Sequence, residues 1–194
     1  MHGTDSRATI FQLILRTGHE FARLDIRHNL SVNFTCDLPY GFQVSGIFIA
    51  QSGIPVSPIY TFDNDRDATT DNEQRPNWAP GVSGTTRVSD TQLFDPASFV
   101  LPPVGSRGNV GRNVIDGPGL VSFDPALVKS FGSKRSAQLR LEMFNAFNRV
   151  NLSIPSVANL TVFNSPTERN ATAGQITSTS TPARQVQLAL RVLF

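Results

Sequence analysis

The chain has 194 residues, about the size of one domain, and its hydrophobic (39%) and charged (16%) contents lie below typical globular values. A net charge of +2 without any run of lysine or arginine argues against nucleic acid as a partner. One cysteine, Cys36, excludes an internal disulfide, and no stretch approaches the ~20 apolar residues of a spanning helix. Abundant Asn, Ser, Thr and Gln instead suit alternating strands and polar loops.

The first strong strand pattern covers residues 25–38. Apolar residues at 30, 32, 34, 36 and 38 alternate with polar residues at the positions between them. Alternation of period two places the apolar side chains on one face of a strand. Pro39-Tyr40-Gly41 predicts a tight turn into a second strand at residues 42–52, and a further strand is expected within residues 9–16.

Two more strands, residues 119–131 and 136–148, are predicted on either side of a tight turn at 132–135. Pro125 weakens the first, because proline inside a strand removes a backbone donor. In the second, Arg140 and Glu142 lie on the polar face, which suits a water-filled lumen. We expect them to pair with neighbouring strands, and we expect no residue to be a catalyst.

The last strand is predicted over residues 183–194. Its apolar face consists of Val186, Leu188, Leu190, Val192 and Phe194. Lipid-facing strands of outer-membrane barrels alternate in this way over about 10 residues. A C-terminal Phe preceded by alternating apolar residues resembles the signal for barrel insertion, which makes the barrel assembly machinery an expected partner. A strand of an ordinary sandwich is the alternative.

Two long segments, residues 53–118 and 149–182, show no sustained alternation and are expected to be loops. Loops of this length in compact soluble domains are usually functional or flexible, whereas transmembrane barrels alternate short periplasmic turns with long outer loops. If the tight turns are periplasmic, four aromatic residues fall at the periplasmic end and would belong to an aromatic girdle. These residues are Tyr40, Phe42, Phe131 and Phe194.

These patterns predict an all-β fold, an antiparallel up-and-down meander that forms part of a transmembrane β-barrel with about five to six strands. The smallest spanning barrels have about 8 strands, and lipid does not tolerate an open sheet edge. We therefore expect residues 1–194 to be the C-terminal part of a larger barrel, or a small protein that assembles with others. The N-terminal residues do not resemble a signal peptide, and truncation is the simplest explanation.

The densest acidic cluster begins at Asp63, Asp65 and Asp67 and continues to Asp71 and Glu73. Oxygen ligands at alternate positions are what Ca²⁺ needs, but Ala68 stands where an EF-hand loop has glycine, and the later bidentate Glu is missing. A solvated loop is therefore favoured over a metal site, and no cofactor is expected. The glycine-rich segment 105–112 lacks the ending of a phosphate loop and is expected to fold an outer loop back onto the barrel mouth.

A series of short motifs runs from Arg16 to Phe194. They are Asp25-Ile26-Arg27-His28-Asn29-Leu30, Leu38-Pro39-Tyr40-Gly41-Phe42-Gln43-Val44-Ser45-Gly46-Ile47, Gln51-Ser52-Gly53-Ile54-Pro55, Arg75-Pro76-Asn77, Phe94-Asp95-Pro96-Ala97-Ser98-Phe99, Gly108-Asn109-Val110-Gly111-Arg112-Asn113, Gly117-Pro118-Gly119, Glu142-Met143-Phe144-Asn145-Ala146-Phe147-Asn148, Ile176-Thr177-Ser178 and Ala183-Arg184-Gln185-Val186-Gln187. In order and spacing they resemble the C-terminal barrel region of TonB-dependent outer-membrane receptors, Oar-like group. Within it, the motif of Glu142, Phe144, Asn145, Phe147 and Asn148 resembles a strand end common among these receptors.

The resemblance implies a parent that moves a substrate across the bacterial outer membrane with energy delivered through TonB. Such receptors have a plug domain, a segment that contacts TonB and about 22 strands. This sequence shows no plug domain and no TonB-contacting segment, so its expected partners are membrane lipid and the parent's other strands and plug. A non-transporting structural or adhesive barrel is the first alternative. A soluble carbohydrate-binding sandwich is the second, and the exposed apolar faces argue against it.

Overall fold

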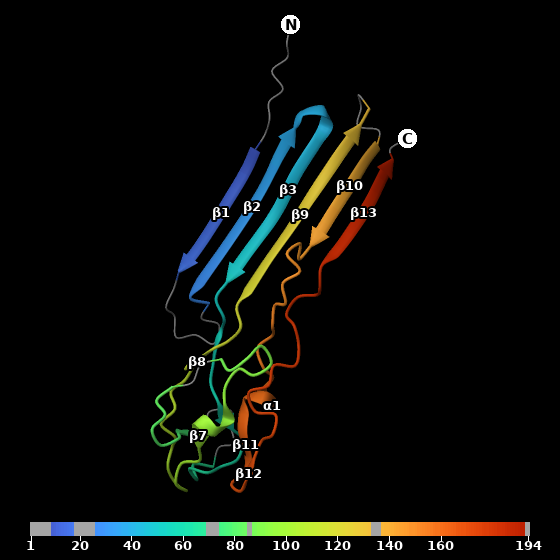
Figure 1. Cartoon of the computed structure of the whole chain (residues 1–194). Coiled ribbons are helices and arrows are strands. Elements are labelled where there is room, and N and C mark those ends of the chain that lie inside the picture. The colour runs from blue at the N-terminus through green and yellow to red at the C-terminus, as the bar shows by residue number, and fades with distance from the viewer. Residues whose placement is uncertain (1–8, 18–25, 69–73, 85–86, 133–136, 193–194) are drawn as a thin grey trace.

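The computed structural model describes residues 9–17, 26–68, 74–84, 87–132 and 137–192. It contains one large antiparallel sheet, and the long connections fold together at one end of it (Figure 1). The strands of this sheet are β1 (Thr9–Thr17), β2 (His28–Leu38), β3 (Phe42–Gln51), β9 (Leu120–Phe131), β10 (Ala137–Phe144) and β13 (Gln185–Val192).

The six strands lie in the order β1-β2-β3-β9-β10-β13, so each pairs with the next long strand along the chain. Every pairing is antiparallel. The predicted all-β meander is therefore confirmed, and the strand expected within residues 9–16 is β1. Among the described strands, β1 and β13 have no partner on their outer sides, so this sheet is open.

A short 3-10 turn, η1 (Pro39–Gly41), connects β2 to β3. Tyr40 and Gly41 both have positive φ values, 64° and 75°. A Cβ atom on Gly41 would lie 2.8 Å from the carbonyl oxygen of Ser130, so glycine is required for this close approach. In Figure 1, η1 and the end of β13 lie at the same end of the sheet, opposite the folded connections.

Two details of the predicted strands differ from the structure: the end of β10 and the effect of Pro125 on β9. β10 ends at Phe144, not at residue 148, because Asn145 and Asn148 both take a φ of 50° that breaks the strand. β9 runs through Pro125, which pairs with Gly46 of β3. The β9–β10 ladder stops at Ala126, so the missing N–H of Pro125 removes no bond from it.

The two long connections form a single folded unit, which we call the loop module (residues 52–119 and 145–184, as far as described). Its elements are β4 (Pro55–Val56), β5 (Ile59–Tyr60), β6 (Asn77–Trp78), η2 (Pro96–Ser98), β7 (Phe99–Val100), β8 (Ile115–Asp116), α1 (Val157–Leu160), β11 (Thr161–Ser165) and β12 (Glu168–Arg169). β5 from the first connection pairs in parallel with β11 from the second. An isolated bridge between Gln92 and Gln175 joins them again.

The hydrophobic core of the described chain lies in the loop module rather than on the sheet. Phe94 and Phe99 are fully buried, and their rings meet edge to face with centroids 5.4 Å apart. Trp78 stacks on Phe99 at 5.1 Å. Tyr60 and Val162 are also fully buried. The described parts of both loops are therefore packed structure.

No helix within the described ranges is long and apolar enough to cross a membrane.

Candidate functional site

Strand register gathers most of the apolar side chains of the six strands on one face of the sheet. One row runs across four strands through Leu13, Val32, Phe48 and Phe123, each paired with the next. A second row runs through Leu127, Leu141 and Leu188 on β9, β10 and β13. Leu13 and Leu188 are 52% and 68% exposed, so an extended apolar surface, which we call the apolar face, lies open. Soluble monomers rarely leave a continuous surface of this kind in water.

The predicted insertion signal lies on β13 at an edge of the apolar face. The side chains of Val186, Leu188, Leu190 and Val192 are all exposed. Three of them pair across the ladder with Met143, Leu141 and Leu139 of β10, and Val192 pairs with Ala137. Phe194, the last residue of the predicted signal, lies outside the described residues.

Aromatic residues mark the turn end of the apolar face. Tyr40 in η1 is 88% exposed, Phe42 begins β3, and Phe131 ends β9. The three residues lie at the same end of the sheet, and their membership of a periplasmic girdle stays a prediction. The fourth predicted member, Phe194, is not among the residues described.

A second aromatic group lies at the other end of β9. Phe123 stacks on Phe147 with ring centroids 5.4 Å apart, and Phe147 is largely exposed. A Cβ atom on Gly46 would lie 2.7 Å from the Phe34 ring and 3.1 Å from the Phe123 ring, so these rings close over the glycine. From Phe123 to Phe131 the strand covers roughly 26 Å, or about 20 Å along the normal of a barrel with strands tilted by about 40°, close to the ~25 Å apolar band of outer-membrane barrels.

The opposite face of the sheet, the polar face, carries charged and hydrogen-bonding side chains. A cavity of about 470 Å³ lies against it, and its lining includes Asn33, Ser45, Asp124, Arg140 and Glu142. Arg140 Nε lies 2.8 Å from Glu142 Oε1, so the two residues pair within β10 and not with neighbouring strands as predicted. This face has the character of a hydrated barrel interior.

Asn145 joins the end of β10 to the chain that follows it and to the segment that precedes β13. Its side chain is buried, and its Nδ2 donates to the carbonyl oxygens of Arg149 (2.9 Å) and Pro182 (3.0 Å), while its Oδ1 accepts from Arg149 N (3.1 Å). Asn148 Oδ1 accepts from the backbone N–H of Arg184, just before β13. The motif that the sequence singled out at a strand end is therefore a turn that attaches the loop module to the sheet.

Asn151 continues this connection, although no pattern in the sequence predicts it. It is fully buried, and its amide forms a two-way pair with the backbone of Val121, from Val121 N to Oδ1 (3.0 Å) and from Nδ2 to Val121 O (2.9 Å). Nδ2 also donates to Thr181 Oγ1 at 2.9 Å. The side chain thus takes the place of a strand residue beside β9. Within an Asn-rich loop, no periodic signal distinguishes this asparagine.

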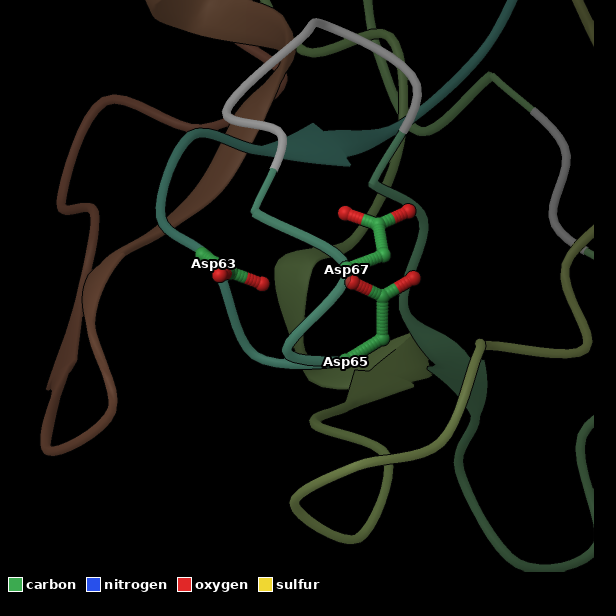
Figure 2. Close-up of side chains that lie close together, drawn as sticks. All are labelled: Asp63, Asp65 and Asp67. Atoms are coloured by element: carbon green, nitrogen blue, oxygen red, sulfur yellow. The ribbon is translucent and has the colours of Figure 1, made fainter.

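The acidic cluster of the loop module is a real spatial group. Carboxylate oxygens of Asp63, Asp65 and Asp67 lie within 4.8 Å of one another (Figure 2). Arg107 binds two of these residues, with Nε 3.2 Å from Asp65 Oδ2 and Nη2 3.0 Å from Asp67 Oδ2. Asp65 also accepts from Gln74 Nε2 at 2.6 Å. The carboxylates could supply oxygen ligands, but in this geometry they already hold a guanidinium. Asp71 and Glu73 lie outside the described residues.

The glycine-rich segment packs against the chain just before β6. A Cβ atom on Gly108 would lie 1.8 Å from the carbonyl oxygen of Arg75 and 2.4 Å from that of Pro76. Val110 N also donates to Pro76 O at 3.1 Å. Glycine is required here because two backbone segments touch.

Residues 15–187 match the family described as Outer membrane beta barrel domain. The chain belongs to this outer-membrane β-barrel family. No curated protein and no solved structure matches it. This membership accounts for the exposed apolar face, because the wall of an outer-membrane barrel turns its apolar side chains toward lipid. The match does not extend to TonB-dependent receptors or the Oar-like group.

Proposed function

We propose that this chain is part of the wall of a TonB-dependent outer-membrane transporter and contributes to energy-coupled uptake of a substrate by the full-length parent. The proposal rests on the difference in side-chain polarity between the two faces of the sheet. One face offers lipid a mostly apolar surface, and the other carries polar and charged side chains around a cavity of about 470 Å³. The order of motifs that resembles Oar-like receptors supports the finer assignment.

The topology supports one orientation in the membrane. Barrels keep short turns on the periplasmic side and long loops outside. The turn η1 and the end of β13 then lie in the periplasm, and the loop module lies at the cell surface (Figure 1). In this position the loop module shapes the external mouth and contacts substrate, as loops on a rigid scaffold commonly do.

The two open edges of the sheet determine which partners it needs in the membrane. Unpaired backbone groups in lipid cost several kcal/mol each, so β1 and β13 need strand partners there. The remaining barrel strands of the parent fill this role, and a plug domain lies against the polar face and contacts TonB. The barrel assembly machinery recognises β13, and no catalytic step is part of the proposal.

The DNA upstream of the Met1 codon provides the test. The proposal predicts an open frame that continues into further alternating strands, a plug domain and a signal peptide. Deletion of Phe194 from that parent is expected to lower its level in the outer membrane. A stop codon beside a working start site at Met1 would contradict the transporter assignment, because the chain then has no plug.

The alternative is a structural or adhesive outer-membrane barrel that does not transport. The loop module favours it specifically, because a folded unit with its own core is a suitable surface for binding a polymer or another cell. Cells that express the parent with and without TonB separate the two functions. Uptake that requires TonB supports transport, whereas surface binding that persists without TonB supports adhesion.

A further inference from the structure

Lys129 is a charged residue on the apolar face. It follows Leu127 by two positions on β9, so its side chain leaves the sheet on the same side. Its cross-strand partners are Phe42 on β3 and Leu139 on β10. A charged side chain among lipid-facing residues is costly unless it reaches the interface or a partner. The position of its amine therefore needs a specific explanation.

The amine of Lys129 is directed to the turn end of the sheet. Nζ lies 4.3 Å from the ring centroid of Phe42 and 5.5 Å from that of Phe131. It also donates a hydrogen bond to the carbonyl oxygen of Tyr40 in η1. The aliphatic part of the side chain thus follows the apolar surface while the charge lies among the aromatic residues, as expected at a membrane boundary.

The charge of Lys129 is not neutralised by the described residues. No ion pair described for the chain includes Lys129. An ammonium group has three donors, and the Tyr40 carbonyl accepts from one of them. A carbonyl and two aromatic rings orient the amine, but they leave its full positive charge beside the apolar face.

We propose that Lys129 and the η1 turn form a binding site for the phosphate of an anionic phospholipid whose acyl chains lie along the apolar face. The inference rests on the proposed function, which places this end of the sheet at the periplasmic leaflet. The headgroup phosphate lies where the strand leaves the hydrocarbon, at the level of Tyr40, and accepts from the free donors of Nζ. Phe42 and Phe131 hold the amine at this depth.

Spin-labelled lipids test the site in the full-length parent inserted into phosphatidylcholine vesicles. Labelled phosphatidylglycerol is expected to associate with the protein about fivefold more strongly than labelled phosphatidylcholine, since one basic group near the surface attracts anionic lipid by about this factor. Lys129→Gln should abolish the preference, and Lys129→Arg should retain it. Arg140→Gln, which removes a cation from the polar face, is the matched control and should leave the preference unchanged.

Two results would overturn the site. One is equal association of the two lipids with inserted wild-type protein, and the other is an unchanged preference in Lys129→Gln. Protease protection of the strands in the same vesicles reports insertion separately. Protein that never inserts would contradict the membrane assignment and the lipid site together, whereas inserted protein without a preference contradicts the lipid site alone.

Discussion

The backbone N–H of Asn145 donates a 2.8 Å hydrogen bond to Oδ1 of Asp124, one strand away. Asp124 lies on the polar face of β9, and Asn145 is the first residue after β10. The β9–β10 ladder stops before this point, and this bond and the bond from Ala146 N to Phe123 O at 2.8 Å hold the two strands together at the end near the loop module. The loop module is thus fixed to the sheet by side chains and turns rather than by a continuing strand.

Replacement of Asn145 by alanine is expected to destabilise the protein by about 2–4 kcal/mol. The change leaves the backbone groups of Arg149 and Pro182 without their partner, and alanine is poorly suited to the φ of 50° at this position. Asn145→Gly, which keeps the backbone conformation, should recover part of the loss. Equilibrium unfolding in detergent measures both.

The control for this prediction is Asn164→Ala, because Asn164 is exposed and its one side-chain bond, to Glu168, is 3.4 Å long. That change should stay within about 0.5 kcal/mol of wild type. Equal effects at the two asparagines would mean that Asn145 has no special part in joining the loop module to the sheet.

Phe99→Ala should loosen the loop module while the sheet stays intact. Phe99 is fully buried between Trp78 and Phe94, and truncation of such a side chain costs about 3–5 kcal/mol. Limited proteolysis should then cut the loop module much faster, with the membrane strands still protected. Val104→Ala removes a side chain that is 63% exposed and should leave the cleavage rate unchanged. Flexible loops without a core would instead be cut rapidly in all three proteins.

The loop module should lose stability as the pH rises above about 10. Burial raises the pKa of Tyr60 above its ordinary value, the nearby charge of Asp65 raises it further, and the Asn64 side chain opposes part of the shift. A group whose pKa is raised in the folded state stabilises the fold below the unfolded pKa, and this contribution is lost as the pH rises through the folded pKa. Thermal unfolding between pH 8 and about 11 measures the effect.

Tyr60→Phe should reduce this alkaline loss. Among the described residues, the Tyr60 hydroxyl is buried and has no hydrogen-bond partner of standard geometry. Its removal should therefore cost little at neutral pH or stabilise the loop module slightly. A strong destabilisation at pH 7 would show that the hydroxyl has a partner that matters.

Arg107 and the three aspartates are expected to form a structural ion-pair cluster rather than a calcium site. Arg107→Gln should lower stability by about 1 kcal/mol, a modest figure because the guanidinium is largely exposed. Calorimetric titration of the wild-type protein with millimolar calcium should give no binding heat. A saturating heat that Asp65→Asn abolishes would show instead that Arg107 gives way to the metal.

The sheet was predictable because apolar and polar residues alternate along most of its strands. Alternation of period two gave β2, β3 and β13 nearly to their ends, and Pro39-Tyr40-Gly41 marked a turn. The loop module was not predictable in this way, because its strands have two to five residues and its core draws Phe94 and Val162 from distant segments. The acidic triplet was visible in the sequence, but its partner Arg107 is 42 residues away from Asp65.

Site-directed spin labels at Leu188 and Gln187 test whether the apolar face of this sheet contacts membrane lipid. The labels are introduced one at a time into the full-length protein in vesicles, with Cys36 replaced by serine. We expect the label at 188 to be relaxed by oxygen dissolved in lipid and shielded from a water-soluble nickel complex, and the label at 187 to show much less contact with lipid. Free access of the nickel complex to both labels would contradict it.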